Sequence, residues 1–246
     1  MIIFKEPATQ KLYTNPDLTF KELDASVKAN MILDSNQGFN SYGLSKAALC
    51  ALTLIQAKAY PNLKVTSLSP GFVQTAMTAG YNANLTPEEG CVSSIKCLFE
   101  PVTSGYYYGS DGLRSPLTVS RDPGTPEYQG EDNPDPSKYK RKWYMIYISL
   151  NDKLIKMYFI TFEKDIAWYI YFVHNCTQNK KDNMEKIKTK HILVTGASSG
   201  IGLALCKQLI RDYDCYVFLG SRNLEKGIAI KIFNYILTLE IVHMSQ

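Results

Sequence analysis

A tyrosine and a lysine stand four positions apart in the stretch "SYGLSKAALC", as Tyr42 and Lys46. On a helix this spacing places both side chains on one face, one turn apart. A phenol has a reference pKa of about 10, and a nearby ammonium stabilises the phenolate and lowers that pKa. Such a tyrosine can give a proton to a carbonyl oxygen as a hydride arrives, or take one in the reverse direction. Alone, the pair is also common on solvated surfaces, so the neighbouring sequence must decide.

A glycine-rich stretch, "HILVTGASSGIGLAL", occupies residues 191–205. Gly196 would allow a tight turn after a buried strand, Gly200 would let the backbone approach a pyrophosphate, and Gly202 would permit close helix–strand packing. The amino end of the following helix offers unpaired N–H groups and a favourable dipole to phosphates. A second apolar run, "CYVFLG", follows. That context favours a dinucleotide-binding loop over a glycine turn without a ligand.

The second run ends in "GSRN", which bears on the choice of cofactor. An acidic residue at this place would accept the ribose 2′-hydroxyl of NAD. Arg222 instead offers a guanidinium to a 2′-phosphate, and Ser221 can add a hydrogen bond. The sequence therefore predicts NADP (NADPH). The alternative is an Arg222 that only faces solvent.

A third motif, "SPGFVQTAM", follows a predicted strand at 63–70. Pro70 and Gly71 give a sharp exit from that strand, and Thr75 can reach a cofactor lying across the strand ends. Together TGASSGIG, YGLSK and SPGFVQT resemble the cofactor, catalytic and post-strand motifs of the short-chain dehydrogenase/reductase family. "PDLTFKELDASVKANMI" and "LTPEEG" are similar to its carbonyl-reductase branch. The resemblance covers roughly residues 10–128 and 184–230.

The resemblance implies an NADP-dependent oxidoreductase that interconverts a ketone or aldehyde and an alcohol, with a small-molecule substrate. Tyr42 would be the catalytic acid/base, and Lys46 would lower its pKa and bind the nicotinamide ribose. The implied cofactor-binding residues come from both ends of the chain: Thr195, Gly196, Ser198, Gly200, Ile201, Gly202, Ser221, Arg222, Pro70, Gly71, Val73 and Thr75.

The elements that must position these residues follow from periodicity and capping signals. A helix is expected at 18–32, with Thr19 and Glu22 as a capping box. A longer, largely apolar helix at 41–60 is expected to be buried and to end at Pro61. A helix at 85–99 would begin at the cap Thr86. "GYYYGSDG" suggests a short strand and turn, and residues 121–137 read as loop. After Lys231 the sequence shows no recognisable continuation.

The motifs stand in an unusual order. Family members run from the glycine loop to the tyrosine helix, whereas here 1–137 resembles the C-terminal-type half and 184–246 the N-terminal-type half. Residues 138–183 form an aromatic and lysine-rich bridge without a motif. The family's Asn-Asn-Ala-Gly stretch and catalytic serine are absent, and neither Ser26 nor Ser41 matches the serine motif. We expect an α/β fold: an incomplete Rossmann-type doubly wound parallel sheet with the order of its halves reversed.

Two other hypotheses remain beside the enzyme. The chain is a fusion or remnant of two reductase fragments that at most binds dinucleotide, because two central strands of the sheet are missing. Alternatively, it is a peripheral membrane or interaction protein that uses the aromatic bridge. A gene fusion and a faulty gene model both account for the order.

Composition further limits the classes of function and location that the sequence allows. The 246 residues carry a net charge of +4 and no compact Lys/Arg run, which predicts no nucleic-acid partner. The six cysteines form no CxxC pair, which indicates reduced thiols and a cytoplasmic location, and no metal site is expected. Charges break the apolar stretches of the bridge well below the roughly 18 residues of a membrane span, and no signal peptide is predicted.

Overall fold

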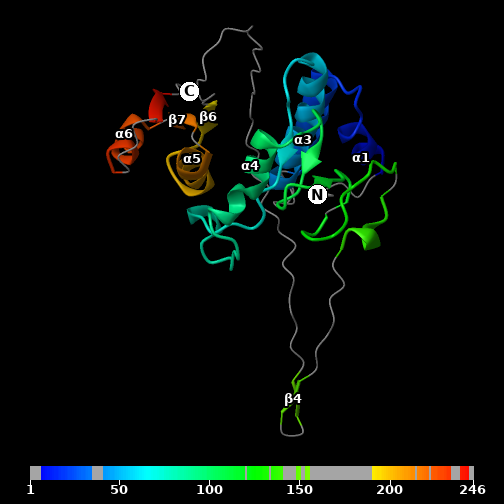
Figure 1. The fold of residues 1–246 in the computed structure, drawn as a ribbon. Helices are drawn as coiled ribbons and strands as arrows, with labels where there is room; N and C mark the ends of the chain where they lie inside the picture. Colours follow the sequence, from blue (N-terminus) through cyan, green and yellow to red (C-terminus); the bar gives the residue numbers. More distant parts are fainter. Residues whose placement is uncertain are drawn as a thin grey trace.

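The computed structural model has a mixed α/β fold with small parallel sheets, compatible with a Rossmann-like fold. Figure 1 shows α5 and α6 on one side of α4, and α1 and α3 on the other. The structure describes residues 7–34, 41–119, 121–132, 134–140, 148–150, 153–155, 190–213, 215–221, 223–233 and 239–243.

The C-terminal part alternates strands and helices. Strands β6 (His191–Thr195), β7 (Tyr216–Ser221) and β8 (Leu239–His243) form a parallel sheet in that order. Helix α5 (Gly200–Tyr213) joins the first pair and α6 (Leu224–Phe233) the second. The expectation of no continuation after Lys231 was therefore wrong. Pairing of β8 along the whole of 217–221 of β7 places "LEIVH" in the sheet.

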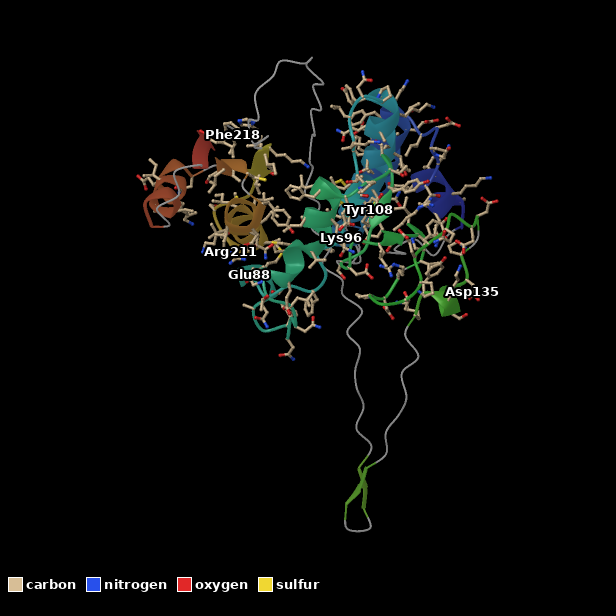
Figure 2. The ribbon with its side chains drawn as sticks, viewed as in Figure 1. Glu88, Lys96, Tyr108, Asp135, Arg211 and Phe218 are labelled. Atoms are coloured by element: carbon tan, nitrogen blue, oxygen red, sulfur yellow. The ribbon has the colours of Figure 1, made fainter. Side chains whose placement is uncertain are left out.

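One face of this sheet packs against α5. Val194, Val217 and Leu219 are each 0% exposed and share a core with the apolar face of α5. The expectation that β6 is a buried strand was only half right, because its residues alternate and Leu193 is 46% exposed. Phe218 lies on the side of the sheet away from α5 (Figure 2). The core thus lies between the sheet and its helices.

The N-terminal part begins with α1 (Pro7–Tyr13), α2 (Phe20–Asp34) and α3 (Ser41–Ala59), which share a separate core. The predicted capping box is confirmed: the Thr19 N–H donates to Glu22 Oε2 at 2.9 Å, and the Glu22 N–H to Thr19 Oγ1 at 3.3 Å. Helix α3 matches its predicted bounds within a residue. The helix was expected to be buried, but only one of its faces is, the one that includes Leu44 and Ala51.

Three very short strands follow. β1 (Ser67–Leu68) pairs in parallel with β2 (Tyr107–Tyr108), which pairs antiparallel with β3 (Arg114–Ser115). The predicted strand at 63–70 is therefore reduced to two residues. In the part of the chain that the structure describes, no strand pairs with the other edge of β1.

Between these strands lie the 3₁₀ helices η1 (Ala76–Thr78) and η2 (Glu89–Cys91) and the helix α4 (Val92–Phe99). The predicted helix at 85–99 is thus regular α-helix only over its second half. Its predicted cap is present: the Glu89 N–H donates to Thr86 Oγ1 at 3.2 Å, and the Thr86 N–H to Glu89 Oε2 at 2.7 Å. Both bonds close the turn that leads into η2.

The hydrogen bonds of the Thr86 cap are expected to contribute to the stability of the fold. Thr86→Ala removes the acceptor for the Glu89 N–H and is expected to lower the free energy of unfolding by about 1 kcal/mol. Urea unfolding followed by circular dichroism measures the change. Thr86→Ser keeps the hydroxyl and serves as the matched control. Equal stabilities of the alanine and serine variants would contradict the role of this bond.

The predicted loop at 121–137 is confirmed apart from η3 (Pro136–Lys138). Arg121, whose side chain is 0% exposed, pairs with Asp111 and donates to Ser115 Oγ at 3.0 Å and to the Thr125 carbonyl at 2.8 Å. These bonds fasten the loop to β3.

Within the bridge, β4 (Ile148–Leu150) and β5 (Lys153–Ile155) pair antiparallel. Most of the remaining residues predicted as the bridge lie outside the described residues. None of the helices described is long and apolar enough to cross a membrane.

The N-terminal and C-terminal parts of the chain dock where α5 meets η2 and α4. Gln208 Nε2 donates to the Glu88 carbonyl at 3.1 Å, and the rings of Phe99 and Tyr213 stack with centroids 4.4 Å apart. Cys91 lies in the same core as Ile201 of α5. We call this contact between η2–α4 and α5 the seam. It brings residues from 88–99 beside the glycine loop.

Candidate functional site

The glycine loop between β6 and α5 has the backbone geometry that its sequence predicts. Gly196 and Gly200 adopt φ values of +65° and +54°, in the left-handed region that favours glycine. A Cβ on Gly202 would lie 2.6 Å from the Gly196 carbonyl oxygen. Only a glycine at 202 therefore lets α5 pack this closely on the loop.

The loop is fixed to the sheet on one side and exposed to solvent on the other. Ala197 is 0% exposed, and its N–H donates to the Gly220 carbonyl of β7 at 3.4 Å. Ile201 is buried in the core under α5, whereas Thr195 and Gly196 are exposed and Ser198 is half-buried. The first N–H groups of an α-helix have no partner within the helix. The exposed loop and the start of α5 can thus receive a phosphate.

The post-strand segment reaches this loop. A Cβ placed on Gly200 would lie 3.5 Å from Thr75 Cγ2. Val73 is 1% exposed and belongs to the same core as Ile201. The structure therefore brings together two of the three motifs, "TGASSGIG" and "SPGFVQT".

The sharp exit predicted at Pro70 and Gly71 is present. Gly71 has φ +81°, and a Cβ there would lie 2.7 Å from Leu85 Cδ1. Pro70 is fully buried. Both residues therefore fix the course of the segment as it leaves β1.

The tyrosine and lysine of α3 lie together, as their spacing predicts. Lys46 Nζ is 5.3 Å from the centroid of the Tyr42 ring. Tyr42 is 44% exposed and Lys46 is half-buried. Burial lowers the pKa of Lys46, and the electrostatic effect of Cys50 opposes it. The pair lies at the partly exposed surface of α3.

Helix α3, which carries this pair, and the glycine loop pack into different cores. Helix α3 packs against α1, α2 and β1, whereas α5 packs against β6, β7 and η2. Figure 1 shows α4 between α3 and α5. Helix α3, which carries Tyr42 and Lys46, is thus set apart from the two motifs that meet at Thr75 and Gly200.

The residues predicted to select NADP are described in part. Ser221 is 4% exposed; its hydroxyl donates to the Asn223 carbonyl at 2.8 Å and accepts from the Asn223 N–H at 3.2 Å. Register places Thr195 and Ser221 at the same carboxyl edge of the sheet. Arg222 lies outside the described residues. The preference for NADP therefore rests on the sequence.

Sequence reasoning missed the residues that support Thr75 and the loop. Thr78 Oγ1 donates to the Val73 carbonyl at 2.7 Å and accepts from the Thr75 N–H at 2.8 Å. A Cβ on Gly90 would lie 2.6 Å from Val73 Cγ2. A lone glycine inside the helical pattern of 85–99 was the available signal for that close approach. No cluster of metal-ligating side chains is found within the ranges described.

β6, the glycine turn and α5 together form a strand–turn–helix unit next to a parallel strand. Dinucleotide-binding domains begin with such a unit. No protein-family profile matches the chain. Over 43 residues it is 54% identical to rat (Rattus norvegicus) 3-keto-steroid reductase/17-beta-hydroxysteroid dehydrogenase 7, a match covering 17% of this chain and 13% of that protein. The human (Homo sapiens) protein of the same name is 52% identical over 42 residues, 17% of this chain and 12% of that protein.

A plant protein gives a longer match. The (+)-neomenthol dehydrogenase of Capsicum annuum is 36% identical over 63 residues, 26% of this chain and 20% of that protein. The chain thus spans a fifth or less of the length of these curated relatives. All three names describe reductases or dehydrogenases.

Proposed function

We propose that the chain is an NADP-dependent oxidoreductase of the short-chain dehydrogenase/reductase type, which reduces a small ketone or aldehyde to an alcohol or catalyses the reverse. The glycine loop carries the proposal: Gly196 and Gly200 are left-handed, and Gly202 lies where any Cβ would overlap the Gly196 carbonyl. Short matches to a keto-steroid reductase and a neomenthol dehydrogenase support the same family. A cytoplasmic location accords with this proposal.

The cofactor would lie along the carboxyl edge of the C-terminal sheet. Six residues of the loop would hold its phosphates and adenosine: Thr195, Gly196, Ser198, Gly200, Ile201 and Gly202. Ser221 and Arg222 would meet the 2′-phosphate of NADP. The nicotinamide would be bordered by Pro70, Gly71, Val73 and Thr75. The 3.5 Å approach between Thr75 and the Cβ position of Gly200 supports this placement.

NADPH, when bound, would supply the hydride for the substrate carbon. Tyr42 donates the phenol proton to the substrate oxygen, and the Lys46 ammonium stabilises the phenolate that forms. The 5.3 Å separation of Lys46 Nζ from the Tyr42 ring supports this pairing. In the reverse direction the phenolate takes the alcohol proton.

We further propose that the chain joins the tail and the head of such a domain in reversed order, without its centre. The sheets β1–β2–β3 and β6–β7–β8 are separate in the structure, which accords with missing strands between them. The boundaries proposed for the three parts are 1–137, 138–183 and 184–246.

A second candidate is a dinucleotide-binding protein without turnover. The observation that favours it is that α3 and the glycine loop belong to different cores. Neighbouring strands are about 4.8 Å apart, and misplacement by about 1 Å can already lower a rate by about a hundredfold. Loss of a strand between Tyr42 and the loop would then abolish hydride transfer while leaving the phosphate site intact.

Titrating the purified chain with NADPH and with NADH, while following nicotinamide fluorescence, tests both candidates. Tighter binding of NADPH, with turnover on a panel of ketones and aldehydes, is expected for the enzyme. Binding without turnover on any substrate would select the second candidate. No fluorescence change with either cofactor would refute both.

The half-buried Lys46 gives the proposed enzyme a pH dependence. In the direction of alcohol oxidation, turnover is expected to fall as pH rises through the pKa of Lys46, which burial holds below the ordinary value of 10.5. The fall occurs because a neutral lysine no longer stabilises the Tyr42 phenolate. Lys46→Arg keeps its charge to higher pH and should move the alkaline limb upward. Identical pH–rate profiles for the two proteins would contradict this role.

A further inference from the structure

A cavity of about 290 Å³ lies between α4, β2 and β3, away from the residues assigned above. Lys96, Tyr108 and Arg114 contribute to its lining, and Figure 2 shows Lys96 and Tyr108 close together. None of the residues predicted for the cofactor or for proton transfer lines it. Its volume is near the lower end of ligand cavities, roughly 300 Å³. It therefore suits a small molecule.

The Arg114 guanidinium makes cation–π contacts with two tyrosine rings. Its Cζ lies 3.6 Å from the centroid of Tyr106 and 4.7 Å from that of Tyr128. The nearby Glu127 carboxylate accepts the backbone N–H of Arg114 at 2.9 Å. Among the described residues, no acceptor or carboxylate pairs with the guanidinium itself. A stacked guanidinium with unused N–H groups is well suited to bind an oxyanion in a bidentate manner.

The second cation, Lys96, is positioned by a glycine. Gly112 has φ +74°, and a Cβ there would overlap the aliphatic stem of Lys96. Within the described part of the chain, the Lys96 ammonium forms no ion pair. The absence of a side chain at 112 thus lets Lys96 lie along the cavity wall.

The remaining lining indicates what kind of anion fits. Glu100 and Glu127 also line the cavity, and their negative charges repel a dianion more strongly than a monoanion. The other lining residues are apolar or aromatic, apart from Thr103 and Gly112: Pro101, Val102, Tyr106, Tyr108 and Leu113. These apolar and aromatic side chains can contact the apolar body of a ligand whose charged group meets Arg114 and Lys96.

We propose that this cavity binds a small monocarboxylic acid with an apolar body, with its carboxylate between Arg114 and Lys96. The site is independent of the proposed oxidoreductase function. NADPH binding should therefore be the same with and without the acid.

Isothermal titration calorimetry of the full chain with benzoate tests the proposal. Benzamide, its neutral counterpart, and inorganic phosphate are the comparison probes. Benzoate is expected to bind, with benzamide and phosphate each weaker by about tenfold or more, the factor that corresponds to one charge-assisted hydrogen bond. Absence of benzoate binding, or equal binding of benzamide or phosphate, would overturn the proposal.

Variants locate the binding site. Lys96→Met keeps the stem and removes the charge, and it should weaken benzoate binding by about tenfold, as should Arg114→Gln. Lys64→Met, an exposed lysine before β1 and outside the cavity, is the matched control and should bind as the natural chain does. If Arg114→Gln does not fold, as judged by circular dichroism, Lys96→Met decides alone. Undiminished benzoate binding by Lys96→Met would refute the assignment.

Discussion

Gly202→Ala is expected to weaken NADPH binding by about a hundredfold, equivalent to about 3 kcal/mol. The added methyl would lie 2.6 Å from the Gly196 carbonyl oxygen, which is backbone and cannot move aside by a change of rotamer. Either α5 or the glycine loop must therefore shift, and the N–H groups proposed to bind the phosphates shift with them. The same overlap should lower the free energy of unfolding by about 1–3 kcal/mol.

Fluorescence titration with NADPH and urea unfolding measure the two effects of Gly202→Ala. Gly80→Ala is the matched control, because Gly80 has φ +84° and a Cβ there has nothing within 4 Å. It introduces backbone strain of about 1–2 kcal/mol without an overlap, and NADPH binding should not change. Unchanged NADPH binding by Gly202→Ala would show that the close packing of α5 on the loop has no part in cofactor binding.

Tyr42→Phe is expected to lower the rate of carbonyl reduction by about 10²–10⁴-fold, the usual contribution of a general acid, with NADPH binding unchanged. The substitution removes the phenol proton but keeps the ring beneath Lys46. Lys46→Met should also lower the rate, because the phenolate then has no neighbouring cation.

Single-turnover reduction with saturating NADPH measures the effect of Tyr42→Phe. Tyr60→Phe provides the control, since Tyr60 lies just past the end of α3 and is 56% exposed. A Tyr42→Phe variant that reduces substrate as fast as Tyr60→Phe would show that proton transfer does not use Tyr42. A natural chain that binds NADPH but turns over no substrate would instead favour the dinucleotide-binding candidate.

Features governed by nearby residues could be predicted from the sequence. The capping box of Thr19 and Glu22, and the bonds between Thr86 and Glu89, each join residues three positions apart. The left-handed glycines of the loop follow from local chain geometry as well. Helix α3 ends where Pro61 was expected to end it, because proline cannot continue the hydrogen-bond pattern.

Features governed by distant contacts could not be predicted. β8 pairs with β7, whereas "LEIVH" alone is a short apolar run that fits several structures. The half-exposed state of β6 depends on what covers each face of the sheet. Likewise, Cys91 Sγ lies 3.6 Å from the Ile201 carbonyl oxygen, 110 residues along the chain. The relation of Tyr42 to the glycine loop belongs to the same category, since separate cores hold them.

The seam also determines the behaviour of two thiols. Cys91 and Cys206 are 0% and 1% exposed, and burial raises the pKa of each to about 12. Both remain protonated and shielded while α5 stays docked on η2, and thiolates are the reactive form. An alkylating reagent would reach them only after undocking. The rate at which these thiols are alkylated would therefore report how often α5 separates from η2 and α4.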